Sequence, residues 1–183
     1  MLRAAQNGRV FPNTVSEQEY LYVRDHKDED PALTGFVGFG TSFGSGFFRG
    51  YGRNNFGRNY ADEATRSLQH DMETLRGIAE FTCLDYRDVY LPDGCVVYAD
   101  PPYNNTTKIH GQQFDIDAFW DYMRIISQSH IVFISELNAP PDFVCVWSKP
   151  VRRSLDVNKQ NKLIAVEKLF VHENNIKVLK GNW

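Results

Sequence analysis

A four-residue segment, Asp100-Pro101-Pro102-Tyr103, constrains the fold of this chain more than any other stretch. It directly follows the apolar run 95–99, which has Asp93-Gly94 before it and the two prolines after it. A run with these boundaries predicts a buried parallel strand that ends abruptly. Because ligands of open α/β sheets bind beyond the carboxyl ends of strands, Asp100 is expected to face a crevice, where its carboxylate and the Tyr103 ring suit a flat, amino-bearing group.

The rest of the chain alternates helix-like and strand-like segments. Helices are predicted at 1–7, 15–26, 62–76 and 115–127, and strands at 79–84, 95–99, 130–136, 143–147 and 163–170. Strands alternating with helices and followed by a hairpin indicate an α/β sheet, mostly parallel, with a C-terminal antiparallel hairpin. No internal repeat or linker is evident, so residues 1–183 are expected to form one domain.

Composition is that of a globular protein, with 42% hydrophobic and 23% charged residues. No apolar stretch is long enough to span a bilayer, and the N-terminus lacks the core of a signal peptide. Cys83, Cys95 and Cys145 lie in apolar runs without the spacing of metal ligands. We therefore expect a cytoplasmic protein without a membrane partner, whose cysteines are reduced and buried.

The basic residues are clustered, although the net charge of −3 argues against a strongly basic nucleic-acid-binding protein. Residues 35–60 contain three arginines and no acidic residue, and residues 149–162 contain five basic residues and one acidic residue. Two basic loops on a mildly acidic body can contact phosphates locally, or can be merely solvated. The candidate phosphate contacts are Arg49, Arg53, Arg58 and Lys108, and in second place Arg152, Arg153, Lys159 and Lys162.

Residues 35–57 hold eight of the thirteen glycines, interleaved with aromatic residues. This composition predicts neither a regular helix nor a strand. It indicates either a loop that faces a substrate or a loop that its aromatic side chains hold against the body of the protein.

The Asp100–Tyr103 segment resembles the catalytic motif of the Dam-type DNA adenine methyltransferases of bacteria and phages. Two further segments carry the resemblance: residues 80–86, where the family has a strand ending near the cofactor, and residues 151–162, which look like its basic turn between two late strands. The resemblance covers most of the chain from about Tyr60 onward. The four-residue motif taken alone also fits an ordinary turn after a strand.

The resemblance implies a Rossmann-like sheet and methyl transfer from S-adenosylmethionine to the exocyclic amino group of adenine in double-stranded DNA. The catalytic residues would be Asp100, Pro101, Pro102 and Tyr103, with the Asp100 side chain and the Pro101 carbonyl accepting hydrogen bonds from the amino group. Tyr103 would stack on the flipped base, which is worth about 1–3 kcal/mol. Asp85, Tyr86 and Asp100 match positions beside the cofactor, although Asp85 and Tyr86 also fit an ordinary turn.

Two elements of the family are not found where they are expected: a lysine-bearing first segment and a strand ending in Phe-x-Gly-x-Gly, which cradles the methionine part of the cofactor. Residues 36–40 have these letters, but a charged segment precedes them and more glycine follows, so the strand–turn–helix context is missing. The sheet is therefore expected to lack its first strands. Because buried, unpaired backbone groups cost several kcal/mol in all, a second polypeptide or a homodimer is expected to supply them.

Two alternatives to a subunit of a split methyltransferase stay open. A catalytically inactive relative would bind DNA or a partner protein without a cofactor, and the substrate amine could instead belong to RNA or protein. Glu136, which ends the next predicted strand, is expected to be a hydrogen-bond partner in the site rather than a base.

Overall fold

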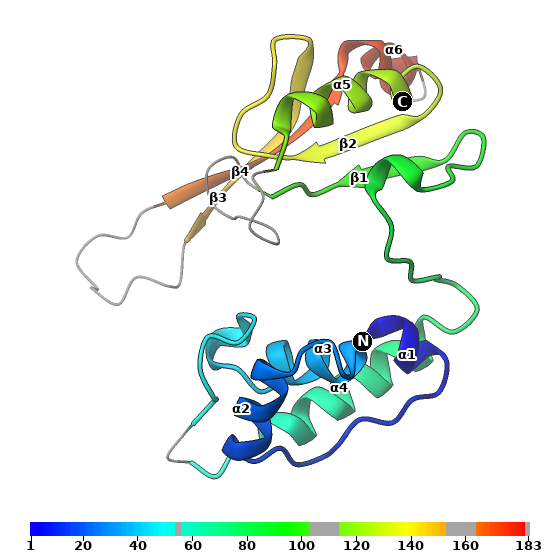
Figure 1. Ribbon diagram of the computed structural model, residues 1–183. Coiled ribbons are helices and arrows are strands. Elements are labelled where there is room, and N and C mark those ends of the chain that lie inside the picture. Colours follow the sequence, from blue (N-terminus) through cyan, green and yellow to red (C-terminus); the bar gives the residue numbers. More distant parts are fainter. Residues whose placement is uncertain (54–55, 103–113, 153–163, 182–183) are drawn as a thin grey trace. The chain divides into compact units, whose positions relative to one another are not determined.

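In the computed structural model, the chain separates after Cys83 into two units, Met1–Cys83 and Leu84–Trp183 (Figure 1). The structure describes residues 1–53, 56–102, 114–152 and 164–181. Each unit has a hydrophobic core of its own and is described by itself. The association of the two units into one domain stays a prediction.

The first unit is helical. Its elements are α1 (Leu2–Gln6), α2 (Glu17–Asp25), α3 (Pro31–Gly40), a short 3-10 helix η1 (Phe43–Ser45) and α4 (Tyr60–Thr74). Local signals set two of these boundaries: Gly8 has a φ of +86° just after α1, and Ser16 and Glu19 form a reciprocal capping box at the start of α2. The predicted helices at 1–7, 15–26 and 62–76 are confirmed.

The core of the first unit forms where α2, α3 and α4 meet the segment before α2. Tyr20, Phe36 and Val37 are almost completely buried, and the rings of Phe11 and Phe36 stack with centroids 4.8 Å apart. Leu68 adds the inner face of α4. The unit is thus held by contacts between helices, without any strand among its described residues.

The absence of regular structure predicted for the glycine-rich segment is wrong for its first part, because α3 runs to Gly40. The Asp30 side chain caps this helix by accepting a hydrogen bond from Leu33 N, and Pro31 begins it. Burial of Phe36 and Val37 then offsets the low helix propensity of glycine. Residues 36–40 are therefore helical and do not form a strand-ending glycine turn, as the sequence context indicated.

The second unit is mixed α/β with an open four-stranded sheet. Its strands are β1 (Val96–Ala99), β2 (Ile131–Ser135), β3 (Phe143–Arg152) and β4 (Ile164–His172), in the order β1-β2-β4-β3. β1 and β2 are parallel, and β4 lies between β2 and β3, antiparallel to both. The C-terminal antiparallel hairpin is thereby confirmed, but the prediction of a mostly parallel sheet is wrong for the described strands, because only β1 and β2 form a parallel pair.

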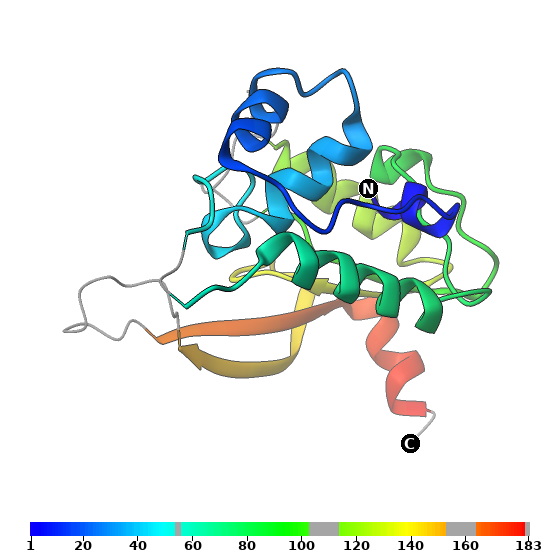
Figure 2. The ribbon, with the colours of Figure 1, turned by 90° about the horizontal axis from the view of Figure 1, so that it is seen from below.

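Two helices pack on this sheet. The helix α5 (Ile116–Ile126) directs Phe119 and Met123 into the core, where Val132 and Ile134 of β2 are fully buried. Figure 2 shows α6 (Glu173–Gly181) leaving the end of β4 directly. The buried Asn175 side chain fixes α6, because Oδ1 accepts a hydrogen bond from Val132 N and Nδ2 donates to the carbonyls of Ser127 and His130.

Two strand predictions need correction. Residues 79–84 form no strand, and Leu84 is exposed, because no neighbouring strand accepts the backbone hydrogen bonds of this segment within the described residues. β1 is a parallel strand, as predicted, but it is not buried: Val96 and Tyr98 are each 63% exposed, and β2 is its only described neighbour.

The cysteines also differ from the prediction. Cys83 and Cys145 are exposed and Cys95 is half-buried, so apolar neighbours in the sequence did not place them in the core. Among the described residues, no helix is long and apolar enough to cross a membrane.

Candidate functional site

A cavity of about 400 Å³ lies where β1 ends. Ala99, Asp100, Pro101 and Pro102 form one side of it. Apolar and aromatic side chains from the segment before β1, from β1 itself, and from α5 and the residue shortly before it form the rest: Tyr86, Val89, Leu91, Val97, Tyr98, Phe114, Phe119, Tyr122, Met123 and Ile126. The strand-end crevice predicted from the sequence is therefore present, and three of the four predicted catalytic residues line it.

The strand end itself orients these residues. The paired register of β1 and β2 stops at Ala99 and Ile134, and the two prolines that follow cannot donate to a ladder. Pro101 is buried and Pro102 is half-buried, whereas Asp100 is exposed. This local rigidity presents the Asp100 carboxylate at the mouth of the cavity. Tyr103 lies outside the described residues.

Tyr86 and Asp85 have different environments, although the sequence paired them. The Tyr86 ring lies in the cavity wall, with its centroid 5.4 Å from that of Tyr122 and 5.7 Å from that of Phe119, and burial raises its pKa. The Asp85 carboxylate instead accepts hydrogen bonds from Arg87, which lower its pKa to about 2. Tyr86 therefore shares the site with Asp100, while Asp85 is occupied by its own ion pair.

Glu136 follows β2 directly and is only 4% exposed. Its Oε1 accepts a hydrogen bond from Leu137 N at 2.9 Å, and its Oε2 is buried with no partner among the described residues. Burial, opposed in part by the Leu137 hydrogen bond and assisted by the negative charge of Asp100, raises the pKa of Glu136. Glu136 is not part of the cavity lining, and burial makes its charged form less favourable than it is in water.

The predicted phosphate contacts of the first unit are only partly available. Arg53 forms an ion pair with Glu17, and Arg58 forms one with Glu63, at exposed positions. Arg49 is exposed, and its side chain runs across Gly46. Arg152 ends β3, but its side chain is not described, and Lys108, Arg153, Lys159 and Lys162 lie outside the described residues.

The glycine-rich segment after α3 is held against the first unit by hydrogen bonds. Tyr51 Oη donates to Val15 O at 2.7 Å, and the Tyr20 hydroxyl accepts from Gly50 N at 3.1 Å. Of the two interpretations of the segment, attachment to the body is thus confirmed. The segment still carries the exposed aromatic rings of Phe43 and Phe47, and Phe39, near the end of α3, is exposed as well.

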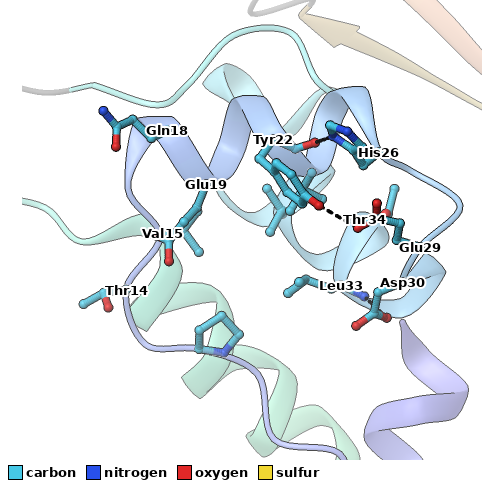
Figure 3. A pocket seen from close by; sticks show the side chains of 13 residues that line it. Thr14, Val15, Gln18, Glu19, Tyr22, His26, Glu29, Asp30, Leu33 and Thr34 are labelled. Carbon is cyan, nitrogen blue, oxygen red and sulfur yellow. Dashed lines mark hydrogen bonds between the residues drawn. The ribbon is translucent and has the colours of Figure 1, made fainter.

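A second cavity, of about 480 Å³, lies in the first unit between α2, α3 and the segment before α2 (Figure 3). Its floor is apolar, and the stacked rings of Tyr22 and His26, with centroids 4.1 Å apart, form one edge. The carboxylates at its rim, Glu19, Glu29 and Asp30, have partners in Ser16, Tyr22 and Arg9. This acidic rim disfavours phosphate. The sequence signal for it was the cluster of acidic residues between positions 17 and 30.

The described residues contain no group of three side chains placed to hold a metal ion. Comparisons of the chain with models of protein families and with curated proteins gave no significant match.

Proposed function

We propose that this chain takes part in methyl transfer from S-adenosylmethionine to the exocyclic amino group of adenine in DNA, as the Asp100-bearing subunit of a split enzyme. The observation that carries the proposal is the position of Asp100 and the two prolines at the mouth of an aromatic cavity beyond β1. Its volume of about 400 Å³ is within the range of about 300–1,000 Å³ typical of small-molecule sites.

The chemistry of the cavity suits a flipped base. Flat aromatic walls from Tyr86 and Tyr122 favour a planar ring, and Asp100 supplies an acceptor at the rim. The lone pair of an aromatic amine is delocalised into the ring, so the amine is a weak nucleophile. Hydrogen bonds from its N–H groups to the Asp100 carboxylate and the Pro101 carbonyl would draw the nitrogen towards sp³ geometry and orient it for an in-line displacement.

S-adenosylmethionine supplies the methyl group when it is bound, but the described residues fit the base better than this cofactor. Residues 36–40 are helical, and the Asp85 carboxylate is held by Arg87. Of these candidates, only Tyr86 lines the cavity. The proposal therefore assigns the base pocket to this chain and most of the cofactor site to another polypeptide.

The edges of the sheet support such a partner. The β3 edge contains a bulge between Cys145 and Trp147, and also Lys149 and Pro150, all devices that block strand addition. β1, at the opposite edge, has none of these, and its Val96 and Tyr98 side chains are exposed. A strand from a second polypeptide, or from a second copy of the chain, would pair with β1 and extend the sheet.

The DNA-facing surface is proposed to be the outer side of the glycine-rich segment. Arg49 can contact a phosphate there, and the exposed rings of Phe43 and Phe47 can stack on bases. Arg53 and Arg58 would exchange their exposed carboxylate partners for phosphates. Such an enzyme would act in the cytoplasm of a bacterium or of a phage-infected host.

The test is the transfer of tritiated methyl groups to unmethylated DNA, with the polypeptide that supplies the cofactor site added to this chain. Asp100→Ala removes the acceptor and should lower the rate by roughly 10²–10³-fold, as for the loss of one transition-state hydrogen-bonding group, while DNA retention stays close to that of the wild type. Asp93→Ala, in the turn before β1, is the matched control. Equal rates for Asp100→Ala and wild type would exclude the mechanism.

A catalytically inactive DNA-binding or partner-binding protein is the second candidate. The helical form of residues 36–40 favours it, because no described segment then has the geometry of a cofactor turn. Adenine-dependent DNA binding without any methyl transfer, with each candidate partner present, would support this function instead.

A further inference from the structure

Glu136 is placed on the same side of the sheet as the cavity. Val97 pairs with Val132 and Ala99 with Ile134, so the continued register sets Glu136 level with Pro101. All of residues 97–102 line the cavity, but side chains alternate along a strand, and it is Val97 and Ala99 that pack in the core with Val132 and Ile134. Glu136 is therefore on the same face of the sheet as the core residues Val132 and Ile134, and it lies beside the cavity.

The buried carboxyl group of Glu136 has one hydrogen-bonding position without a partner. Leu137 N satisfies Oε1, whereas Oε2 has no partner among the described residues. A buried carboxylate in this state is far less stable than the neutral acid, whose proton would make Oε2 a hydrogen-bond donor. Glu136 has no role in the proposed mechanism. In its neutral form, its Oε2 is a buried hydrogen-bond donor without a described acceptor.

The charged and titratable groups around Glu136 and the neighbouring cavity come from β1, β4, α5 and the segment before β1. Asp100, at the end of β1, raises the pKa of Glu136 through its negative charge, in addition to the larger effect of burial. Lys168 of β4 lies level with Glu136, whose backbone N–H donates to Lys168 O at 3.4 Å, but no ion pair between the two side chains is described. Tyr86, Tyr98 and Tyr122 are the hydroxyl-bearing residues of the cavity wall among the described residues.

We propose that Glu136, as a neutral acid, is a specificity-determining residue that donates a hydrogen bond to a ring nitrogen of the base whose amino group Asp100 accepts. The inference rests on the proposed function and deepens it. Together the two side chains would recognise an amino group next to an unprotonated ring nitrogen, which adenine has. Hypoxanthine presents a carbonyl and a ring N–H there, so its carbonyl would face Asp100 and its N–H would face the Glu136 donor.

Recognition requires a movement of the Glu136 side chain. Oε2 is covered in the structure, so the carboxyl group has to rotate towards the cavity when a base enters. The hydrogen bond from Leu137 N is the described interaction that this rotation breaks. The rotation breaks no described ion pair of Glu136.

The test measures binding of the full chain to short oligothymidylates that carry one adenine or one hypoxanthine at the same position, from pH 5 to pH 9. Wild type should prefer adenine by about tenfold or more at pH 5, because a mismatched buried donor costs about 1–3 kcal/mol. The preference should fall as the pH rises and Glu136 ionises. Glu136→Gln keeps a donor without a titrating proton, so its preference should persist at every pH, whereas Glu136→Met should keep at every pH only the smaller preference that Asp100 provides.

Glu167→Gln, on the exposed side of β4, is the control for loss of one negative charge and should behave as wild type. The inference is overturned if Glu136→Met prefers adenine at pH 5 as strongly as wild type does, or if Glu136→Gln loses its preference with pH as wild type does. Equal binding of both oligonucleotides by wild type would overturn it together with the base pocket. Methyl transfer that depends on Asp100, combined with an adenine preference that ignores Glu136, would leave the proposed function standing and refute this inference alone.

Discussion

At the scale of single residues, the environment of each carboxylate decides whether it is available for binding. Asp85 carries the acidic side chain that the sequence placed beside a cofactor, yet its neighbour Arg87 already binds it. No ion pair of Asp100 is described, and the two residues that follow it are uncharged prolines. Residue type does not predict this difference, because both carboxylates belong to exposed aspartates.

A carboxylate with a structural role allows a prediction about acid stability. Arg124 donates to both oxygens of Asp142, at 2.5 and 2.9 Å, and these hydrogen bonds hold the pKa of Asp142 below its ordinary value. A lowered folded-state pKa means that the stability is present above the ordinary value of 3.8 and is lost as the pH falls through the lower, folded value. Because both side chains are about one-third exposed, we expect a contribution of less than about 1 kcal/mol.

Urea unfolding at a series of pH values measures this contribution. Asp142→Asn should be less stable than wild type at pH 6, and the difference should shrink as the pH falls below 3.8. Asp121→Asn is the matched control, because Asp121 also contacts Arg124 but is far more exposed. A constant difference at all pH values would show that the ion pair is not the cause.

At the scale of elements, local sequence patterns predicted the helices better than they predicted the strands. Capping residues begin α2, α3 and α4. The sequence predicted α2 and α4 to within about two residues, but it did not predict α3, because this helix contains three glycines. A strand depends on a neighbour instead. Residues 79–84 have an apolar pattern typical of a strand but no described neighbour, whereas β1 has β2.

The attachment of α6 depends on one buried side chain. Asn175→Ala would remove three hydrogen bonds and leave the backbone groups of Ser127, His130 and Val132 short of a partner. The expected loss is about 2–3 kcal/mol in the free energy of unfolding, measured by urea denaturation. Asn174→Ala, at the exposed neighbouring position, should change it little. A similar effect of the two substitutions would contradict this account.

The glycine in the middle of α3 is required for packing. A Cβ at Gly38 would lie 2.5 Å from the Phe47 ring and 2.9 Å from the Phe48 ring. Gly38→Ala should therefore lower stability by about 1–3 kcal/mol, although alanine favours a helix more than glycine does. Phe47→Ala should cost much less in the Gly38→Ala background than in wild type. Independent effects in this double-mutant cycle would mean that the close contact is not the reason for the glycine.

At the scale of the whole molecule, the second unit ends in two unlike sheet edges. One edge carries a bulge, a lysine and a proline, and the other, β1, exposes a regular strand with large side chains. Regular edges with exposed apolar side chains favour pairing with another chain. The open edge next to Asp100 is consistent with a site that a second polypeptide completes.

This difference predicts where association occurs. Tyr98→Lys, on β1, should weaken binding to the partner polypeptide, or self-association, by at least tenfold, as measured by sedimentation velocity. Val144→Lys, an exposed position on β3, should have little effect. The melting temperature should be nearly the same in both variants, because both positions are exposed. Unchanged association in Tyr98→Lys would exclude strand addition at β1.

The sequence by itself determined the end of β1, the place of Asp100 beyond it, the C-terminal hairpin and most helix boundaries. These features arise from prolines, caps and apolar periodicity, which act over a few residues. Only the tertiary structure decided that Tyr86 lines the cavity, that Glu136 is buried without a partner for Oε2, and that Arg53 is paired with Glu17. Such properties depend on desolvation and on charges brought together from distant positions, and no local pattern encodes them.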